Sequence, residues 1–178
     1  MSFYYPRQIR FHETDGAGVV YFANLLTLCH EAYEASLGAV GIDLADFFSP
    51  QGLVVPVVHG SLDCLRPLVC GDRLTIALSP RPLPQGDRPL SDFEIHYRLL
   101  AVPAPSTEGT VEICAEDWEQ QLSPAQTFAQ ATTRHVCIDA ASRRRQVLPP
   151  DLAAWLQRWQ AAPGMGEAQS HAAAESTG

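Results

Sequence analysis

The segment at about residues 21–40 has helical periodicity and is apolar on most of its surface. With successive residues placed about 100° apart, its polar side chains occupy a single arc of about 120°. These side chains are Asn24, Thr27, His30, Glu31 and Glu34, and mostly apolar residues fill the rest of the circumference. A helix of this kind has to be covered on most sides by other elements. That requirement constrains the fold more than any other feature of the sequence.

Most of the remaining periodic segments alternate like β-strands. The clearest alternation is at residues 93–99, and a half-exposed strand is expected at 3–11. Further strands are expected at 53–68, 74–78, 111–118 and 128–138. Pro56 and Gly60 should bend the first of these. The order predicts an α+β fold, in which one curled antiparallel sheet wraps around a long central helix.

The sheet and the helix account for residues 1–140, which we expect to form one domain. Residues 141–162 should form a C-terminal extension with a short helix, in which Trp155 is a core or subunit contact. Residues 163–178 are small, polar and aperiodic, which is typical of a flexible tail. A curled sheet leaves strand edges and one face uncovered. This predicts a homodimer that pairs sheets, and a homotetramer built as a dimer of dimers.

The composition narrows the possible functions. Acidic residues outnumber basic ones by 20 to 12, and every basic residue is arginine. A nucleic acid partner is not expected, because it would need a basic face, and chemistry that depends on lysine is excluded. The sequence has no apolar run of about 20 residues and no apolar stretch in its first ten, so we expect a cytoplasmic protein with no membrane partner. The five cysteines show no paired spacing, and no metal or other cofactor is expected.

The segment between the first strand and the helix carries the residues best suited to chemistry. Gly16 and Gly18 let a ligand approach the backbone of this turn, where Asp15 lies. The first helical amides are expected near Phe22, without intrahelical carbonyl partners and at the positive end of the helix dipole. This arrangement suits acyl transfer, with the Phe22 amide binding a developing oxyanion and Asp15 acting as general base or nucleophile. The alternative is that Asp15 only caps the helix or orders the turn.

Two strings, FHETDGAGVVYFANLLTLCHEAYEA and VVHGSLDCLRPLVCGDRLTI, resemble hot-dog-fold acyl-CoA thioesterases of the 4-hydroxybenzoyl-CoA thioesterase type. More narrowly, they resemble the 1,4-dihydroxy-2-naphthoyl-CoA thioesterases of cyanobacterial phylloquinone biosynthesis. The resemblance covers roughly residues 3–140. The thioesterase branch is indicated by an Asp-x-x-Gly-x-x-Tyr/Phe core at Asp15, Gly18 and Tyr21-Phe22, and the naphthoyl assignment by the overall similarity of the longer strings. It implies that Asp15 is the catalytic carboxylate and that the Phe22 backbone amide polarises the thioester carbonyl. It also implies hydrolysis of an aromatic acyl-CoA, and 1,4-dihydroxy-2-naphthoyl-CoA is the substrate that it favours.

Five residues are candidates for binding the substrate. Gly18 and Tyr21 border the expected site, and His30 and Glu31 could orient a hydroxylated ring or the attacking water. A polar stripe on a helix is also typical of a subunit contact or a solvated face. His59 lies next to Gly60, where a ligand could approach, although a structural histidine would fit the same position.

The arginine run at 143–145 could bind the phosphates of coenzyme A, or it could be a solvated basic surface. Two further alternatives concern the function itself. The chain could be an acyl-CoA thioesterase of other aromatic or aliphatic specificity, because pocket walls set the substrate. It could also be a module that binds acyl thioesters without catalysis.

Overall fold

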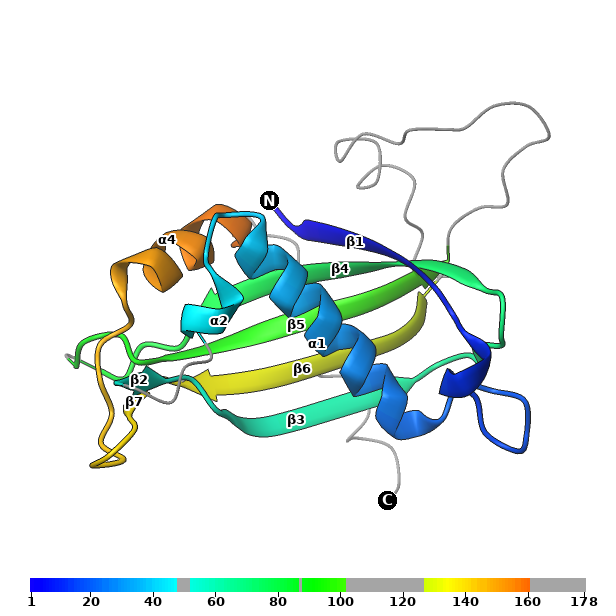
Figure 1. Cartoon of the computed structure of the whole chain (residues 1–178), viewed down its shortest axis with the longest axis horizontal. Helices are drawn as coiled ribbons and strands as arrows, with labels where there is room; N and C mark the ends of the chain where they lie inside the picture. The colour runs from blue at the N-terminus through cyan, green and yellow to red at the C-terminus, as the bar shows by residue number, and fades with distance from the viewer. Residues whose placement is uncertain (48–51, 87, 102–126, 161–178) are drawn as a thin grey trace, which may run out of the picture.

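The curled sheet and the long helix predicted from the sequence are both present in the computed structural model, which describes residues 1–47, 52–86, 88–101 and 127–160 (Figure 1). The strands are β1 (Phe3–Gln8), β2 (Leu53–Val54), β3 (Val57–Cys64), β4 (Arg73–Pro82), β5 (Asp92–Ala101), β6 (Thr127–Val136) and β7 (Ile138–Asp139). The helices are η1 (Phe11–Glu13, a 3₁₀ turn), α1 (Phe22–Gly38), α2 (Leu44–Phe47) and α4 (Pro150–Trp159). Within these ranges no helix is long and apolar enough to cross a membrane.

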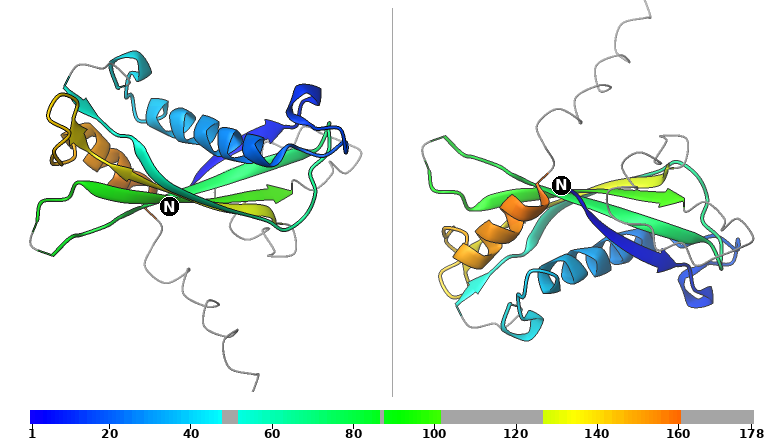
Figure 2. Two further views of the ribbon diagram at one scale, coloured as in Figure 1. Left: turned by 90° about the horizontal axis from the view of Figure 1, so that it is seen from below. Right: turned by 90° about the horizontal axis from the view of Figure 1, so that it is seen from above.

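The main sheet is antiparallel and has the strand order β1-β4-β5-β6-β3, so β1 and β3 are its edges. Helix α1 lies along one face of this sheet (Figure 2). The side chains of β5 that face it are Phe93, Ile95, Tyr97 and Leu99, all at most 1% exposed. They pack with Leu25, Leu28 and other buried residues of α1 in one core. The period-two pattern of β5 therefore matches its two environments.

The first predicted strand is shorter than its alternation suggests. Strand β1 ends at Gln8, and Phe11 begins η1 with 82% of its surface exposed. The Glu13 carboxylate accepts a 2.6 Å hydrogen bond from the Arg10 amide, which turns the chain away from the sheet. A local side-chain contact of this kind competes with strand pairing, and alternation alone does not reveal it.

The predicted strand at 53–68 is divided in two, as its proline suggested. Strand β2 ends before Pro56, which has no amide hydrogen to donate. Strand β3 follows, with a register shift between Val57 and His59. The chain leaves the sheet after Cys64, where the next two amides both donate to the Phe128 carbonyl. The predicted strand at 111–118 and the predicted tail at 163–178 lie outside the described residues.

The C-terminal extension packs on the same core through α4. Trp155 is fully buried and its Nε1 donates a 2.9 Å hydrogen bond to Ser36 Oγ on α1. The segment before α4 is held by Arg145, which contacts both oxygens of the buried Asp92 carboxylate at 3.0 and 2.9 Å. The expected core role of Trp155 is thus confirmed.

A buried histidine lies under the helix. His135 on β6 is 1% exposed, stacks on the Phe93 ring and exchanges a 2.9 Å hydrogen bond with Thr133 Oγ1. Burial, together with the nearby His30, lowers the pKa of His135 to about 4. The imidazole is therefore neutral at physiological pH.

Candidate active site

The turn that holds Asp15 is closed by backbone hydrogen bonds. The Asp15 amide donates to the Val19 carbonyl at 2.9 Å, and the Gly18 amide donates to the Asp15 carbonyl at 3.0 Å. Gly18 has a φ of +78°, a conformation that glycine adopts at little cost. The Val20 amide then donates to the Leu68 carbonyl at 2.8 Å, so the turn is attached to the segment that follows β3.

The Asp15 side chain is exposed at the tip of this turn. Its Oδ1 accepts a 2.8 Å hydrogen bond from the Ala17 amide, and Oδ2 has no hydrogen bond from any other described residue. The contact to Ala17 is what the turn-ordering alternative predicts. It occupies one carboxylate oxygen and leaves the other available to a water or a substrate.

The start of α1 presents two free amides beside this turn. The Tyr21 amide donates to the Glu13 carbonyl at 3.0 Å, and the Asn24 amide donates to the Tyr21 carbonyl at 2.8 Å. Within the described residues, no backbone carbonyl accepts from the amides of Phe22 or Ala23, and the first turn of α1 has no acidic side chain. These amides lie at the positive end of the helix dipole and are suited to bind a carbonyl oxygen that gains negative charge.

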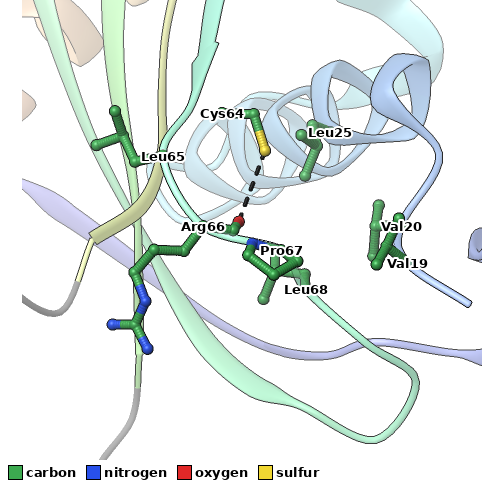
Figure 3. Close-up of a pocket in the computed structure, with 8 residues that line it drawn as sticks. All are labelled: Val19, Val20, Leu25, Cys64, Leu65, Arg66, Pro67 and Leu68. Carbon is green, nitrogen blue, oxygen red and sulfur yellow. Dashed lines mark hydrogen bonds between the residues drawn. The ribbon is translucent and has the colours of Figure 1, made fainter.

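A small apolar cavity lies between the start of α1 and the segment after β3 (Figure 3). Its volume is about 260 Å³, and it is lined by Val19, Val20, Leu25, Cys64, Leu65, Arg66, Pro67 and Leu68. The Arg66 side chain extends away from the apolar side chains in Figure 3, and its guanidinium lies 5.2 Å from the centre of the Phe128 ring. The cavity adjoins the Asp15 turn through Val19 and Val20 but does not include the carboxylate.

The structure brings together four of the predicted site residues and separates the others. Asp15, Gly18, Tyr21 and Phe22 belong to one turn and the helix start that follows it, and Tyr21 and Phe22 are exposed at 56% and 54%. His30 is eight residues further along α1, about 12 Å at the usual helical rise. Its ring centre lies 5.8 Å from that of Tyr33, a residue of the core.

Within one chain, Glu31 is paired with an arginine of β1, and His59 lies on the other face of the sheet. The Glu31 carboxylate forms a 2.8 Å ion pair with Arg7 on β1. In the sheet register, His59 on β3 lies opposite Arg134 on β6, and Arg134 lies opposite Glu94 on β5. These side chains therefore share the sheet face that points away from α1. Their proposed roles in substrate binding stay predictions.

The arginine run is divided between structural and exposed positions. All three arginines are exposed, and of them Arg145 is held by Asp92, as described above. The buried thiol on α1 is also unsuited to catalysis, because burial raises the pKa of Cys29 to about 12. Among the described residues, no three His, Cys, Asp or Glu side chains are grouped so as to hold a metal ion.

Sequence reasoning missed a charged cluster directly beneath the turn. Glu13 is only 6% exposed and receives hydrogen bonds from the Arg7 guanidinium and the Arg10 amide. The Asn24 side chain donates to the Glu13 carbonyl at 2.9 Å. The available signal was the position of Glu13, an acidic residue two places before Asp15 in the segment singled out for chemistry.

A curled antiparallel sheet around one helix, with a carboxylate turn leading into the helix start, defines a hot-dog thioesterase-type domain. The model of the thioesterase-like superfamily matches residues 9–156, and the chain belongs to this superfamily. The predicted α+β hot-dog fold is therefore confirmed.

Relatives of known name agree with this assignment. The chain is 43% identical over 157 residues to a 1,4-dihydroxy-2-naphthoyl-CoA hydrolase from Nostoc punctiforme, with 88% of each chain covered. It is 42% identical over 160 residues to the enzyme of that name from Trichodesmium erythraeum, covering 90% of this chain and 99% of the relative. The crystal structure of a 1,4-dihydroxy-2-naphthoyl-CoA thioesterase from Synechocystis superposes with a TM-score of 0.69 at 32% identity, covering 88% and 96% of the two chains.

Proposed function

We propose that the protein hydrolyses the thioester of 1,4-dihydroxy-2-naphthoyl-CoA to 1,4-dihydroxy-2-naphthoate and coenzyme A, a step of phylloquinone biosynthesis. The relatives named above support the substrate. The observation that carries the chemistry is the turn that joins the free oxygen of Asp15 to the unpaired amides of Phe22 and Ala23. A cytoplasmic location is part of the proposal, since the substrate carries the highly charged coenzyme A.

In the proposed reaction the thioester carbonyl oxygen accepts a hydrogen bond from the Phe22 amide. As the carbonyl carbon becomes tetrahedral, its oxygen gains negative charge, and a preorganised donor of this kind lowers the activation barrier by about 3 kcal/mol. Asp15 acts in one of two ways. As a general base it takes a proton from the attacking water, and as a nucleophile it forms an anhydride that water then hydrolyses. In both cases the coenzyme A thiolate leaves and is protonated.

A second copy of the chain is proposed to complete the site. Seven of the eight residues of the edge strand β3 are exposed, including Val57 at 43% and Val58 at 55%. An edge of this length with exposed apolar residues is suited to pair with another strand. The cavity begins where β3 ends, at Cys64, so a partner on this edge would also lie beside the cavity. We propose a dimer of this kind, and a tetramer built from two such dimers.

The test of the reaction is a thiol-release assay with naphthoyl, benzoyl and fatty acyl thioesters of coenzyme A. We expect the highest kcat/KM with 1,4-dihydroxy-2-naphthoyl-CoA. A higher value with another thioester would assign the enzyme to that substrate instead. Saturable binding without thiol release would leave only a binding module.

The role of Asp15 has a matched control in the same chain. Asp43 Oδ1 accepts a 2.8 Å hydrogen bond from the amide two residues ahead, as Asp15 does, and a further one of 3.2 Å from the Asp46 amide. Both Asp15→Asn and Asp43→Asn preserve this acceptor. We expect Asp15→Asn to lower kcat by at least about 100-fold and Asp43→Asn to leave it unchanged. Equal and small effects would mean that Asp15 only orders its turn.

A further inference from the structure

Glu13 is a charged residue in a place where charge is costly. Its side chain is 8% exposed and lies between β1 and the start of α1. A buried carboxylate is stable only when it is paired and hydrogen-bonded. The Arg7 guanidinium supplies the pairing charge, and the Arg10 amide donates a hydrogen bond of 2.6 Å. The carboxylate therefore fixes Glu13 to the end of β1 and to the chain that follows it.

The backbone of the same residue holds the start of the helix. The Glu13 carbonyl accepts from the Tyr21 amide at 3.0 Å and from the Asn24 side chain at 2.9 Å. Tyr21 is the N-cap residue of α1, and Asn24 is in its first turn. One residue thus binds the sheet through its side chain and the helix through its backbone.

Two neighbouring amides stay free at the start of the helix. The Tyr21 amide is used by Glu13, and the Asn24 amide is used by the Tyr21 carbonyl. The two amides between them, of Phe22 and Ala23, are left to face a ligand. The Glu13 carbonyl contacts the residues on both sides of these two amides, Tyr21 and Asn24.

We infer that Glu13 is a positioning residue for thioester hydrolysis, which holds the Phe22 amide in the direction of the substrate carbonyl. The inference rests on the proposed function. Glu13 does not touch the reacting atoms, and it acts through the Tyr21 and Asn24 contacts. Oxyanion donors are effective because they are aligned before the charge develops, and a misplacement of about 1 Å can cost about 100-fold in rate.

Arg7, which pairs with Glu13, also contacts the helix further along its length. Its guanidinium lies 2.8 Å from Glu31 as well as bonding Glu13. One cation therefore links β1 to the residue before the turn and to the middle of α1. Glu31 was a candidate for substrate binding because of its position on the polar arc. Its contact with Arg7 gives it a structural role as well, which is to hold α1 against β1.

The test compares Glu13→Ala, Glu13→Gln and Asn24→Ala with the control Asp92→Asn. Asp92 is also a buried carboxylate paired with an arginine, but it holds the C-terminal extension. Steady-state rates with 1,4-dihydroxy-2-naphthoyl-CoA are measured at a temperature at which circular dichroism shows every variant folded. We expect kcat to fall at least about tenfold in Glu13→Ala and Asn24→Ala with KM nearly unchanged. Glu13→Gln, which keeps an acceptor for the Arg10 amide, should recover part of the loss.

A second measurement does not depend on activity. Residue-resolved hydrogen exchange should be at least about tenfold faster for the Tyr21 and Asn24 amides in Glu13→Ala, and unchanged for the amides of 29–33. Unchanged exchange at Tyr21 and Asn24 would overturn the inference, even if no thioester were hydrolysed. A kcat within twofold of the wild type in Glu13→Ala, or an equal loss of kcat in Asp92→Asn, would also overturn it. Wild-type protein that releases no thiol would instead refute the proposed function.

Discussion

Trp155 Nε1 lies 2.9 Å from Ser36 Oγ, a hydrogen bond between residues that are 119 positions apart in the chain. Ser36 Oγ also donates to the Tyr33 carbonyl at 2.7 Å, so the hydroxyl is used as both donor and acceptor. Both residues are fully buried. The contact attaches α4 to the end of α1 opposite the candidate site.

We expect Trp155→Phe to lower the free energy of unfolding by about 2 kcal/mol, because it removes a buried hydrogen bond and part of a packed ring. Urea denaturation followed by circular dichroism would measure the change. Thiol release by the folded variant should stay at the wild-type rate. A stability loss below about 0.5 kcal/mol would show that α4 contributes little to the core.

Gly18 and Gly16 offer a matched pair within the candidate turn. A Cβ added at either position would meet no heavy atom within 4 Å, and only Gly18 has a positive φ, of 78°. Gly18→Ala should therefore lower the free energy of unfolding by about 1 to 2 kcal/mol through backbone strain alone. Gly16→Ala should change it by less than about 0.5 kcal/mol. Equal losses in thermal denaturation would contradict the assigned backbone conformation.

His135 predicts how stability depends on pH. Its pKa is lowered from 6.5 to about 4 in the folded protein by burial. The unfolded chain therefore takes up a proton, at a pH where the folded protein does not. Above about pH 6.5 His135 should not lower the free energy of unfolding. As the pH falls to about 4, proton uptake by the unfolded chain should lower that free energy by about 3 kcal/mol in total.

Urea denaturation at several pH values would measure this loss. His135→Gln should remove this part of the pH dependence, whereas the control His96→Gln, at a half-exposed position, should retain it. Parallel curves for the wild type and His135→Gln would show that other groups cause the acid sensitivity.

The proposed pairing through β3 can be tested with two valines of equal exposure. Val58 on the β3 edge and Val147 in the C-terminal extension are each 55% exposed. A lysine placed on an edge strand opposes strand pairing by its charge. We expect Val58→Lys to lower the sedimentation coefficient toward that of a monomer and to reduce thiol release, while Val147→Lys changes neither. An unchanged assembly in Val58→Lys would locate the interface elsewhere.

The elements with strong periodicity were predictable from the sequence because each keeps the same buried side and the same more exposed side along its whole length. The side of α1 that meets the sheet is buried along the helix, and β5 is buried on its helix-facing side, so apolar residues recur at regular intervals. The Asp15 turn was found for a different reason. Two glycines next to an acidic residue before a helix form a local pattern, which can be recognised without knowing the tertiary structure.

The brace formed by Arg7, Glu13 and Glu31 was not predictable in this way. Arg7 and Glu31 are 24 positions apart and meet only because β1 lies beside α1. Arg7 shares the parity of the apolar residues of the first strand and Glu31 lies on the polar arc of the helix, but nothing in the sequence indicates that the two meet. The end of β1 was misjudged for a related reason, since a hydrogen bond to Glu13 turns the chain where alternation continues.

The hydrogen bond from the Ala17 amide to Asp15 Oδ1 reconciles the two interpretations of Asp15. A carboxylate on a flexible tether would sample many orientations, and freezing them would add to the activation barrier. The bond to Ala17 restricts the orientation of the carboxylate without a substrate. In the proposed reaction, the contact that makes Asp15 resemble a turn residue would also orient its second oxygen.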